Sequence, residues 1–334
     1  MSQYRAFRVD KDANKQFHRS IVELDTNDLP AGDLLIDVHY SSLNYKDALS
    51  ATGSPGVTRN FPHTPGIDAA GIIIESGDSA FQAGDEAICI GFDLGMGTAG
   101  GYGERIRVPA GWVVPKPAGL SLREAMIIGT AGFTAAVCVH KLEAMGLTPK
   151  AGPVLVTGAS GGVGSVAVLL LASLGYEVCA VTGKASAQGL LGRLGANQFM
   201  TREQAADNAD KPLLPETWAG VVDTVGGEIL VNGLKSLKYA GSLASCGLVA
   251  SPRISATVLP FILRHVNLLG VDSVQLPLQQ KAEIWQKLAT SWRLDALEQL
   301  VMPITLDTLS EHLDKILAGE MIGRGLVSHH AAMS

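Results

Sequence analysis

The spacing of apolar and polar residues changes along the chain. In the first 120 or so residues, short apolar stretches bounded by Gly, Pro, Asp and Asn predict the strands of a barrel-like β fold. From Gly152 onwards, strand-length apolar runs alternate with helical ones, which indicates a doubly wound parallel sheet. The predicted strands are residues 34–40, 71–75, 86–90 and 104–108, then 153–157, 177–182, 197–200, 220–224, 242–246 and 268–271.

Signals at the two junctions suggest where the domains divide. The sequence SLRE at 121–124 is a capping box and predicts a helix from Ser121 to about Gly146. After a helix at 278–292, the tail reads as strand 300–305, a helix around 310–317 and strand 325–328, able to return to the β region. We therefore predict a β-rich domain, residues 1–120 completed by 300–334, and a doubly wound α/β domain, residues 121–299.

Composition excludes several classes of protein. Apolar residues make up 47% of the 334 residues and charged residues 17%, which is the wrong balance for a disordered chain. A net charge of −6 offers no general basic surface for nucleic acid or anionic membrane. The apolar run at 163–174 falls short of the ~20 residues that span a bilayer, and no secretory signal is visible. The four isolated cysteines favour neither a disulfide framework nor a zinc site. We expect a cytoplasmic protein with no membrane or nucleic-acid partner.

The most informative stretch is VLVTGASGGVGS at 154–165. A buried strand, a glycine-rich turn and an apolar helix follow in the order that a dinucleotide site requires. The turn lets a pyrophosphate approach the backbone, and the helix N-terminus supplies unpaired N–H groups. The fingerprint is imperfect because Ala159 replaces its first glycine, with Gly158 beside it.

The end of the second strand of this domain indicates which cofactor binds. An NAD-specific site usually carries Asp or Glu there, whereas this chain offers Thr182, Lys184 and Ser186. Arg202 follows the third strand and supplies a second cation or packs on adenine. Hydroxyls and cations suit a 2′-phosphate, so we predict NADP(H). The alternative is that Lys184 is an ordinary surface lysine.

Several motifs together resemble the medium-chain dehydrogenase/reductase superfamily, and in particular its zinc-free NADPH-dependent acrylyl-CoA reductases, long labelled quinone oxidoreductases. These motifs are SSLNYKDALSATG (41–53), FPHTPGIDAAG (61–71), IIGTAGFTAAVCV (127–139), TGASGGVGSVAV (157–168), LPFILRHVNLLGVDSV (259–274) and GRGLV (323–327). The resemblance covers essentially the whole chain. It implies a GroES-like catalytic domain, a Rossmann cofactor domain and an active site between them.

The same motifs bear on zinc. Zinc-dependent members have an early catalytic cysteine and a Gly-His-Glu, but this chain has Ile67 in place of the histidine and no cysteine before Cys89. Isoleucine cannot ligate a metal, so we expect no catalytic metal. We interpret His63, His39, His140 and His265 as structural, and we expect His329 and His330 to lie in a frayed tail.

The resemblance also implies roles for individual residues. Asn44 and Tyr45 face the nicotinamide and are the catalytic candidates, and Thr130 helps to seat that ring. The other implied cofactor contacts are Ser160, Gly161, Gly162 and Val163 at the pyrophosphate, Thr182, Gly183, Lys184 and Arg202 at the adenosine end, and Leu248, Ile262, Ser273 and Arg324 elsewhere. Without the resemblance, Tyr45 reads as a core aromatic residue at the domain junction.

The implied reaction is NADPH-dependent reduction of a conjugated C=C bond, most specifically acryloyl-CoA to propionyl-CoA. Tyr45 or water supplies the proton, and the sequence does not choose between them. Arg59 and Arg264 are candidates for binding the phosphates of CoA. One alternative is an NADPH:quinone oxidoreductase, and another is a non-catalytic NADPH-binding protein. The superfamily implies a homodimer with a small-molecule substrate.

Overall fold

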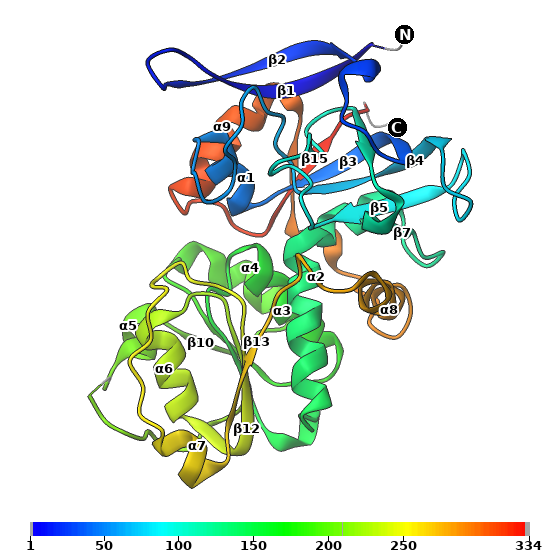
Figure 1. Ribbon diagram of the computed structural model, residues 1–334. Helices are drawn as coiled ribbons and strands as arrows, with labels where there is room; N and C mark the ends of the chain where they lie inside the picture. Colours follow the sequence, from blue (N-terminus) through cyan, green and yellow to red (C-terminus); the bar gives the residue numbers. More distant parts are fainter. Residues whose placement is uncertain (1–2, 209, 331–334) are drawn as a thin grey trace. The chain divides into compact units, whose positions relative to one another are not determined.

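The computed structural model describes residues 3–208 and 210–330, which form two compact units (Figure 1). The first unit contains residues 1–130, 274–291 and 300–334, and the second contains 131–273 and 292–299. Each unit is described separately below. The division differs from the predicted domains because α8 (Leu278–Ala289) contacts β7 (Val113–Pro115) of the first unit. Lys281 of α8 also donates a 2.8 Å hydrogen bond to the carbonyl oxygen of Ile90.

A mainly antiparallel seven-stranded sheet is the centre of the first unit. Its strand order is β14-β15-β3-β4-β5-β7, with β6 paired to β3. Buried aliphatic residues of these strands, among them Ile36, Val38 and Ile73, form its core. The bounds are β3 Leu34–Leu43, β4 Asp68–Ser76, β5 Glu86–Ile90, β6 Arg105–Val108, β14 Val301–Ile304 and β15 Arg324–Ser328.

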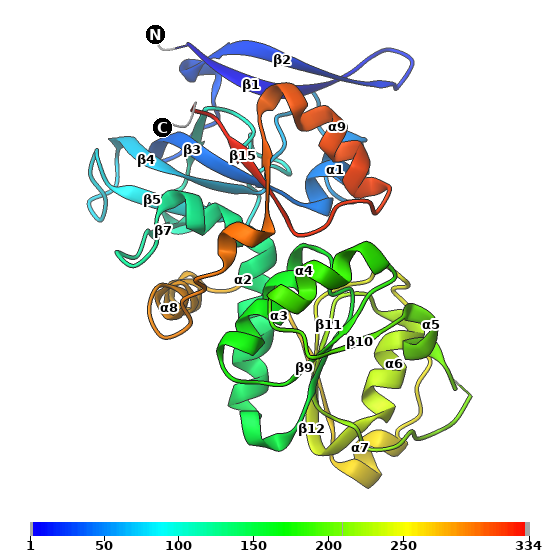
Figure 2. The same ribbon diagram turned by 180° about the vertical axis from the view of Figure 1, so that it is seen from behind.

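The C-terminal segment returns to this sheet, as the sequence pattern predicts. Strand β15 pairs antiparallel with β3, with Gly325 opposite Leu43. Helix α9 (Leu306–Leu317), which precedes β15, lies beside the short helix α1 (Tyr45–Ala51) (Figure 2). The sequence analysis did not predict α1. It also missed the hairpin of β1 (Gln3–Lys11) and β2 (Phe17–Asp25), in which polar residues interrupt the apolar pattern.

The second unit is a Rossmann fold. Its six parallel strands follow the order β10-β9-β8-β11-β12-β13, and helices cover both faces of the sheet. The strands are β8 Val154–Val156, β9 Val178–Val181, β10 Gln198–Met200, β11 Trp218–Asp223, β12 Leu237–Ser245 and β13 Asn267–Gly270. The helices include α3 Gly162–Ser173, α4 Gln188–Arg193, α5 Arg202–Ala206, α6 Gly227–Lys235 and α7 Leu259–Arg264. All six strands overlap the apolar runs that predict them, although β12 begins at Leu237, before its predicted run at 242–246.

The boundary between the units falls inside α2 (Leu122–Ala144). The predicted capping box is present, since the N–H of Glu124 donates to Ser121 Oγ and the N–H of Ser121 donates to Glu124 Oε2. By length and composition α2 is able to cross a membrane, but 83% of its most apolar window is buried inside the protein. It is therefore better explained as a core helix.

Candidate active site

The start of α1 holds two adjacent residues in different environments. Asn44 is the N-cap of the helix and is buried, and its backbone N–H donates to Asp47 Oδ2 at 2.9 Å. Tyr45, the first helical residue, remains 46% exposed. Tyr45 therefore does not lie in the core of the first unit. The backbone of the NYKD motif is thus anchored on one side, while the tyrosine ring is accessible.

Asn44 belongs to a buried polar network centred on Asp68, the first residue of β4. The Asp68 carboxylate accepts hydrogen bonds from Asn44 Nδ2 at 2.8 Å and from the backbone N–H of Thr130 at 2.9 Å. The hydroxyls of Ser42 and Thr130 also donate to it. A buried carboxylate is stable only when its oxygens are satisfied in this way. Asp68 therefore fixes Asn44 and Thr130, two of the predicted site residues, relative to each other.

Gly129 is the backbone position that makes this network possible. It has φ +50° and interrupts α2, a conformation that disfavours residues with a Cβ. A Cβ at this position would lie 2.3 Å from Ser42 Oγ, 2.6 Å from Asp68 Oδ2 and 2.7 Å from Arg324 Nη2. Glycine is thus required by both the dihedral angle and the space, and the break in the helix aims the N–H of Thr130 at Asp68.

Arg324, the first residue of β15, places its positively charged guanidinium group at the Asp68 network. It is 1% exposed, and its guanidinium donates to the carbonyl oxygens of Ile127 and Leu43 and to Asn44 Oδ1. Burial lowers the pKa of Arg324, and the nearby carboxylates of Asp68 and Asp47 oppose that effect. Its Nη2 atom is buried without a hydrogen-bond partner among the described residues. Nη2 is therefore an unsatisfied donor within the buried network.

Asp47 is a second buried carboxylate, on the third residue of α1. It accepts hydrogen bonds from the backbone N–H groups of Asn44 and Ile67 and from the hydroxyl of Tyr102. Burial and the charge of Asp68 raise the pKa of Asp47 to about 7. The sequence analysis assigned no role to Asp47, Asp68, Ser42 or Tyr102. The available signal was an aspartate at the head of the apolar run DAAGIII.

In the second unit, the glycine-rich turn connects β8 to α3. Gly161 is the N-cap of α3, so the first N–H groups of the helix have no acceptor within it. A Cβ on Gly164 would lie 2.4 Å from the carbonyl oxygen of Gly158, which explains why this position needs glycine. Ser160, Gly161, Gly162 and Val163 thus form the start of a helix at the carboxyl edge of a parallel sheet, the arrangement that cradles a phosphate.

The candidate adenosine residues lie at the same edge of the sheet. Thr182 Oγ1 donates to Ser160 Oγ at 3.1 Å and accepts from the N–H of Lys184 at 3.1 Å, which joins the end of β9 to the glycine turn. A Cβ on Gly183 would lie 2.8 Å from Arg202 Nε, so the arginine packs over this glycine. The structure therefore brings Thr182, Gly183, Lys184 and Arg202 together.

The remaining predicted contacts divide between the two edges of the sheet. Leu248 follows β12 and Ser273 follows β13, both at the carboxyl edge, and Ser273 Oγ accepts from Thr134 Oγ1 at 2.7 Å. Ile262 lies on α7, which leads into the start of β13 at the opposite edge, and is 69% exposed. The structure does not bring Ile262 to the glycine turn. Arg264, on the same helix, donates to the carbonyl oxygens of Lys235 and Leu214. These hydrogen bonds give Arg264 a structural role within the second unit instead of a role in binding CoA.

The residues around Ile67 do not fit a catalytic zinc ion. Ile67 is buried and has no ligand atom, and burial raises the pKa of the Cys89 thiol to about 12. His63 is structural, since its Nε2 donates to the carbonyl oxygen of Gly95 at 2.9 Å. Within residues 3–208 and 210–330, the one group of three potential metal ligands is Asp37, His39 and His330, outside the 61–71 motif. The absence of a catalytic metal stays a prediction.

Family models match both units of the chain. Residues 30–118 match the alcohol dehydrogenase GroES-like domain, and residues 162–290 match the domain called zinc-binding dehydrogenase. A GroES-like domain joined to a Rossmann sheet is the architecture of the medium-chain oxidoreductases. The second model takes its name from zinc, but the Ile67 position lies outside the residues that it matches.

Relatives that match over full length give the subfamily. Acrylyl-CoA reductase AcuI of Ruegeria pomeroyi is 44% identical over 98% of this chain and 100% of its own. The yhdH oxidoreductase of Salmonella enterica, solved in complex with NADP, is 45% identical, with a TM-score of 0.94 over 98% of this chain and 100% of its own. Bacillus subtilis yhfP, solved with NAD bound, is 42% identical, with a TM-score of 0.96 and the same coverage, and carries a provisional quinone oxidoreductase name. The chain therefore belongs to the medium-chain dehydrogenase/reductase family, in its zinc-free subfamily of acrylyl-CoA reductases and quinone oxidoreductases.

Proposed function

We propose that this protein is an NADPH-dependent reductase of conjugated C=C bonds that converts acryloyl-CoA to propionyl-CoA. The observation that carries the proposal is the 44% identity to an acrylyl-CoA reductase along 98% of the chain. The exposed Tyr45 on a buried, rigid support is consistent with it.

The second unit holds the cofactor in this proposal. The N–H groups at Ser160–Val163 would hold the pyrophosphate, and Thr182, Lys184 and Arg202 would hold the 2′-phosphate, since the end of β9 carries no opposing carboxylate. Leu248 and Ser273 line the same edge. Arg324 stays a cofactor contact that the resemblance implies. The bound cofactor supplies the hydride.

In this proposal, side chains of the first unit stabilise the charge that develops on the substrate and supply the proton. As hydride reaches the β-carbon of an enoyl thioester, negative charge develops on the thioester oxygen, and oriented donors stabilise that charge. Asn44 is held by Asp68, Arg324 and the carbonyl oxygen of Ser42, so it is a positioning group. Tyr45 is the accessible hydroxyl beside it, and we assign to it the stabilisation of the enolate or the delivery of the proton to the α-carbon.

A quinone oxidoreductase is the second candidate, favoured by the name of the Bacillus subtilis relative. Steady-state kinetics with NADPH and either acryloyl-CoA or 1,4-benzoquinone separate the two functions. We expect kcat/KM to be at least about tenfold higher for acryloyl-CoA, which corresponds to about 1.4 kcal/mol of transition-state stabilisation. A higher value for the quinone would replace the proposed function with the alternative. Failure to turn over either substrate despite NADPH binding would favour a non-catalytic protein.

We further propose a cytoplasmic homodimer whose interface includes α7 and β13. Strand β13 is an edge of the Rossmann sheet with open hydrogen-bonding groups, and its Leu268 is exposed. Ile262 and Leu263 of α7 are also exposed, which suits a subunit interface better than a cofactor contact. Sedimentation velocity tests this proposal, since Leu263→Asp should produce a monomer at concentrations where the unmodified protein is a dimer.

A further inference from the structure

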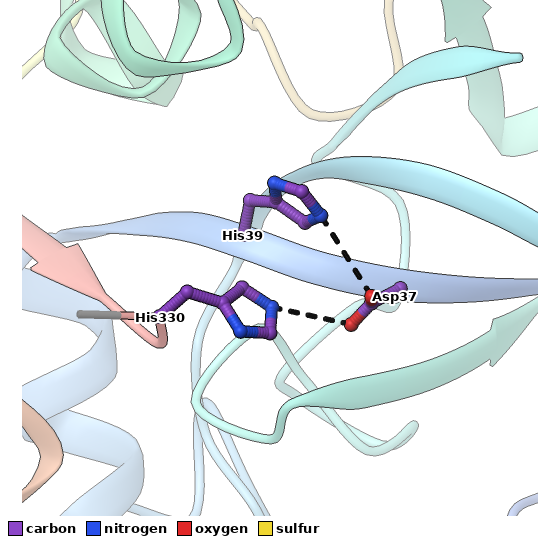
Figure 3. A group of neighbouring side chains, drawn as sticks. All are labelled: Asp37, His39 and His330. Carbon is purple, nitrogen blue, oxygen red and sulfur yellow. Dashed lines mark ion pairs between the residues drawn. The ribbon is translucent and has the colours of Figure 1, made fainter. Parts of the chain in front are cut away.

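Three potential metal ligands converge on the β3 side of the first unit, among residues that the proposed reaction does not use. They are Asp37, His39 and His330, and their ligand atoms lie within 4.8 Å of one another (Figure 3). Asp37 and His39 are two positions apart on β3, at an irregularity in the pairing of β3 with β4 between Val38 and Tyr40. His330 approaches from the segment just after β15.

The distances fit a small cation. His39 Nε2 is 3.7 Å from Asp37 Oδ2, and His330 Nε2 is 3.4 Å from Asp37 Oδ1. Ligands about 2.0–2.1 Å from a tetrahedral zinc ion lie about 3.3–3.4 Å from each other, so the site closes around an ion with small side-chain movements. The two imidazole rings meet edge to face, with centroids 4.7 Å apart, which leaves both Nε2 atoms directed at the carboxylate.

The backbone that carries His330 is anchored, contrary to the expected frayed tail. His329 is partly buried, its N–H donates to the carbonyl oxygen of His39 at 3.1 Å, and its Nε2 donates to the carbonyl oxygen of Gly101 at 2.7 Å. His330 therefore follows a residue that is fixed at two points. This anchoring preorganises the third ligand.

Arg105 is the charged neighbour that such a site must accommodate. Its Nη1 is paired with Asp37 Oδ1 and also donates to the carbonyl oxygen of Glu104. A carboxylate has about four acceptor positions, two on each oxygen, so Oδ1 can accept from Arg105 while positions on both oxygens remain available to an ion. Ligating carboxylates are commonly held by such an outer partner, which fixes their orientation.

We propose that Asp37, His39 and His330 bind one late first-row divalent metal ion, of which Zn²⁺ is the best fit, and that the ion clamps the end of β15 to β3. Two imidazoles and one carboxylate suit zinc, cobalt, nickel or copper and not calcium or magnesium. Three protein ligands leave the fourth position to water. The clamp would stabilise the strand that carries Arg324, because a ligand that binds only the folded state raises its stability.

The test is titration of the chelator-treated full chain with Co²⁺, followed by its visible ligand-field absorption and by displacement with Zn²⁺. We expect one equivalent to bind. His39→Gln and His330→Gln should each weaken binding at least about tenfold. His18→Gln is the matched control, because His18 pairs with Asp12 at 2.9 Å but has no third ligand in the described part of the chain.

A second readout protects the test against poorly folded variants. Zn²⁺ should raise the melting temperature of the unmodified chain and of His18→Gln by several degrees, but not that of His39→Gln, while all three melt alike in chelator. Absence of Co²⁺ binding, or binding that survives in His39→Gln and His330→Gln, would overturn the proposal. Turnover of acryloyl-CoA should be the same before and after chelation, so this test is independent of the proposed reaction.

Discussion

The polar groups of the Asp68 network in the first unit are mostly buried and hydrogen-bonded, whereas those at the carboxyl edge of the Rossmann sheet are mostly exposed. In the network, nearly every polar atom is buried and bonded to another side chain or to the backbone. At the carboxyl edge, helix N–H groups and exposed side chains such as Arg202 face outward. The first region is thus almost fully paired within the protein, apart from Arg324 Nη2, whereas the first N–H groups of α3 in the second region have no acceptor within the helix. Substitutions in the network should therefore mainly lower the free energy of unfolding, and those at the edge should mainly lower the affinity for the cofactor.

Removal of the buried cation should have the largest effect. Arg324→Met leaves two buried carboxylates without their positive neighbour and removes the donor to the carbonyl oxygen of Ile127. We expect the free energy of unfolding, measured in urea at pH 7, to fall by about 3–5 kcal/mol. Arg107→Met is the matched control, since Arg107 pairs with an exposed Glu75, and should change stability by at most ~1 kcal/mol. A comparable small loss in both variants would mean that the network is not stabilised by Arg324.

The pH dependence of the free energy of unfolding should reveal the raised pKa of Asp47, the second buried carboxylate. The pKa of Asp47 is about 7 in the folded protein, beside Asp68, Tyr102 and Arg324, and about 3.9 in the unfolded chain. The folded state therefore holds a proton that the unfolded state releases between about pH 4 and pH 7. The contribution of Asp47 is fully present below pH 4 and decreases as the pH rises through that window. Relative to Asp47→Asn, the unmodified protein should lose on the order of 2–4 kcal/mol from pH 4 to pH 7. Urea unfolding at several pH values measures this difference, and a constant gap would contradict the raised pKa.

Tyr45 is exposed, although it directly follows the buried Asn44 of the network. Tyr45→Phe keeps the ring, so the melting temperature and NADPH affinity should hardly change. If the hydroxyl stabilises or protonates the enolate, kcat with acryloyl-CoA should fall by about one to two powers of ten. Quinone reduction should fall less, because solvent can protonate a quinone anion. An unchanged kcat would leave this work to backbone donors and water.

How well each region could be predicted from the sequence depends on how far apart in the sequence its interacting residues lie. The Rossmann unit was readable because its strands are local apolar runs and its glycine turn is one contiguous motif. The capping box at Ser121 was equally local. The order of the strands and the return of β15 to β3 agree with those local signals.

The Asp68 network was not readable in this way. Its members come from β3, α1, β4, the break in α2 and β15, with Arg324 about 280 residues from Asn44. No local spacing shows that Gly129 must lack a Cβ because Ser42 and Asp68 approach it. The resemblance supplied Asn44, Thr130 and Arg324 as site residues but not the carboxylates that hold them. It also supplied Ile262, whose place at the opposite edge of the sheet only the topology reveals.

Lys184 should give the smallest and most selective effect, because it acts from a partly exposed edge where solvent screens its charge. Lys184→Ala should raise the Kd of NADPH about tenfold, near 1.4 kcal/mol, and leave the Kd of NADH nearly unchanged, since only NADPH carries the 2′-phosphate. The unmodified protein should bind NADPH at least about tenfold more tightly than NADH for the same reason. Fluorescence titration of both cofactors measures all four constants. Lys238→Ala is the matched control, because Lys238 donates to the carbonyl oxygen of Ala151 at the amino-terminal edge of the same sheet. An equal loss for both cofactors would assign Lys184 to the fold and not to the phosphate, and equal affinities in the unmodified protein would reject the NADPH preference itself.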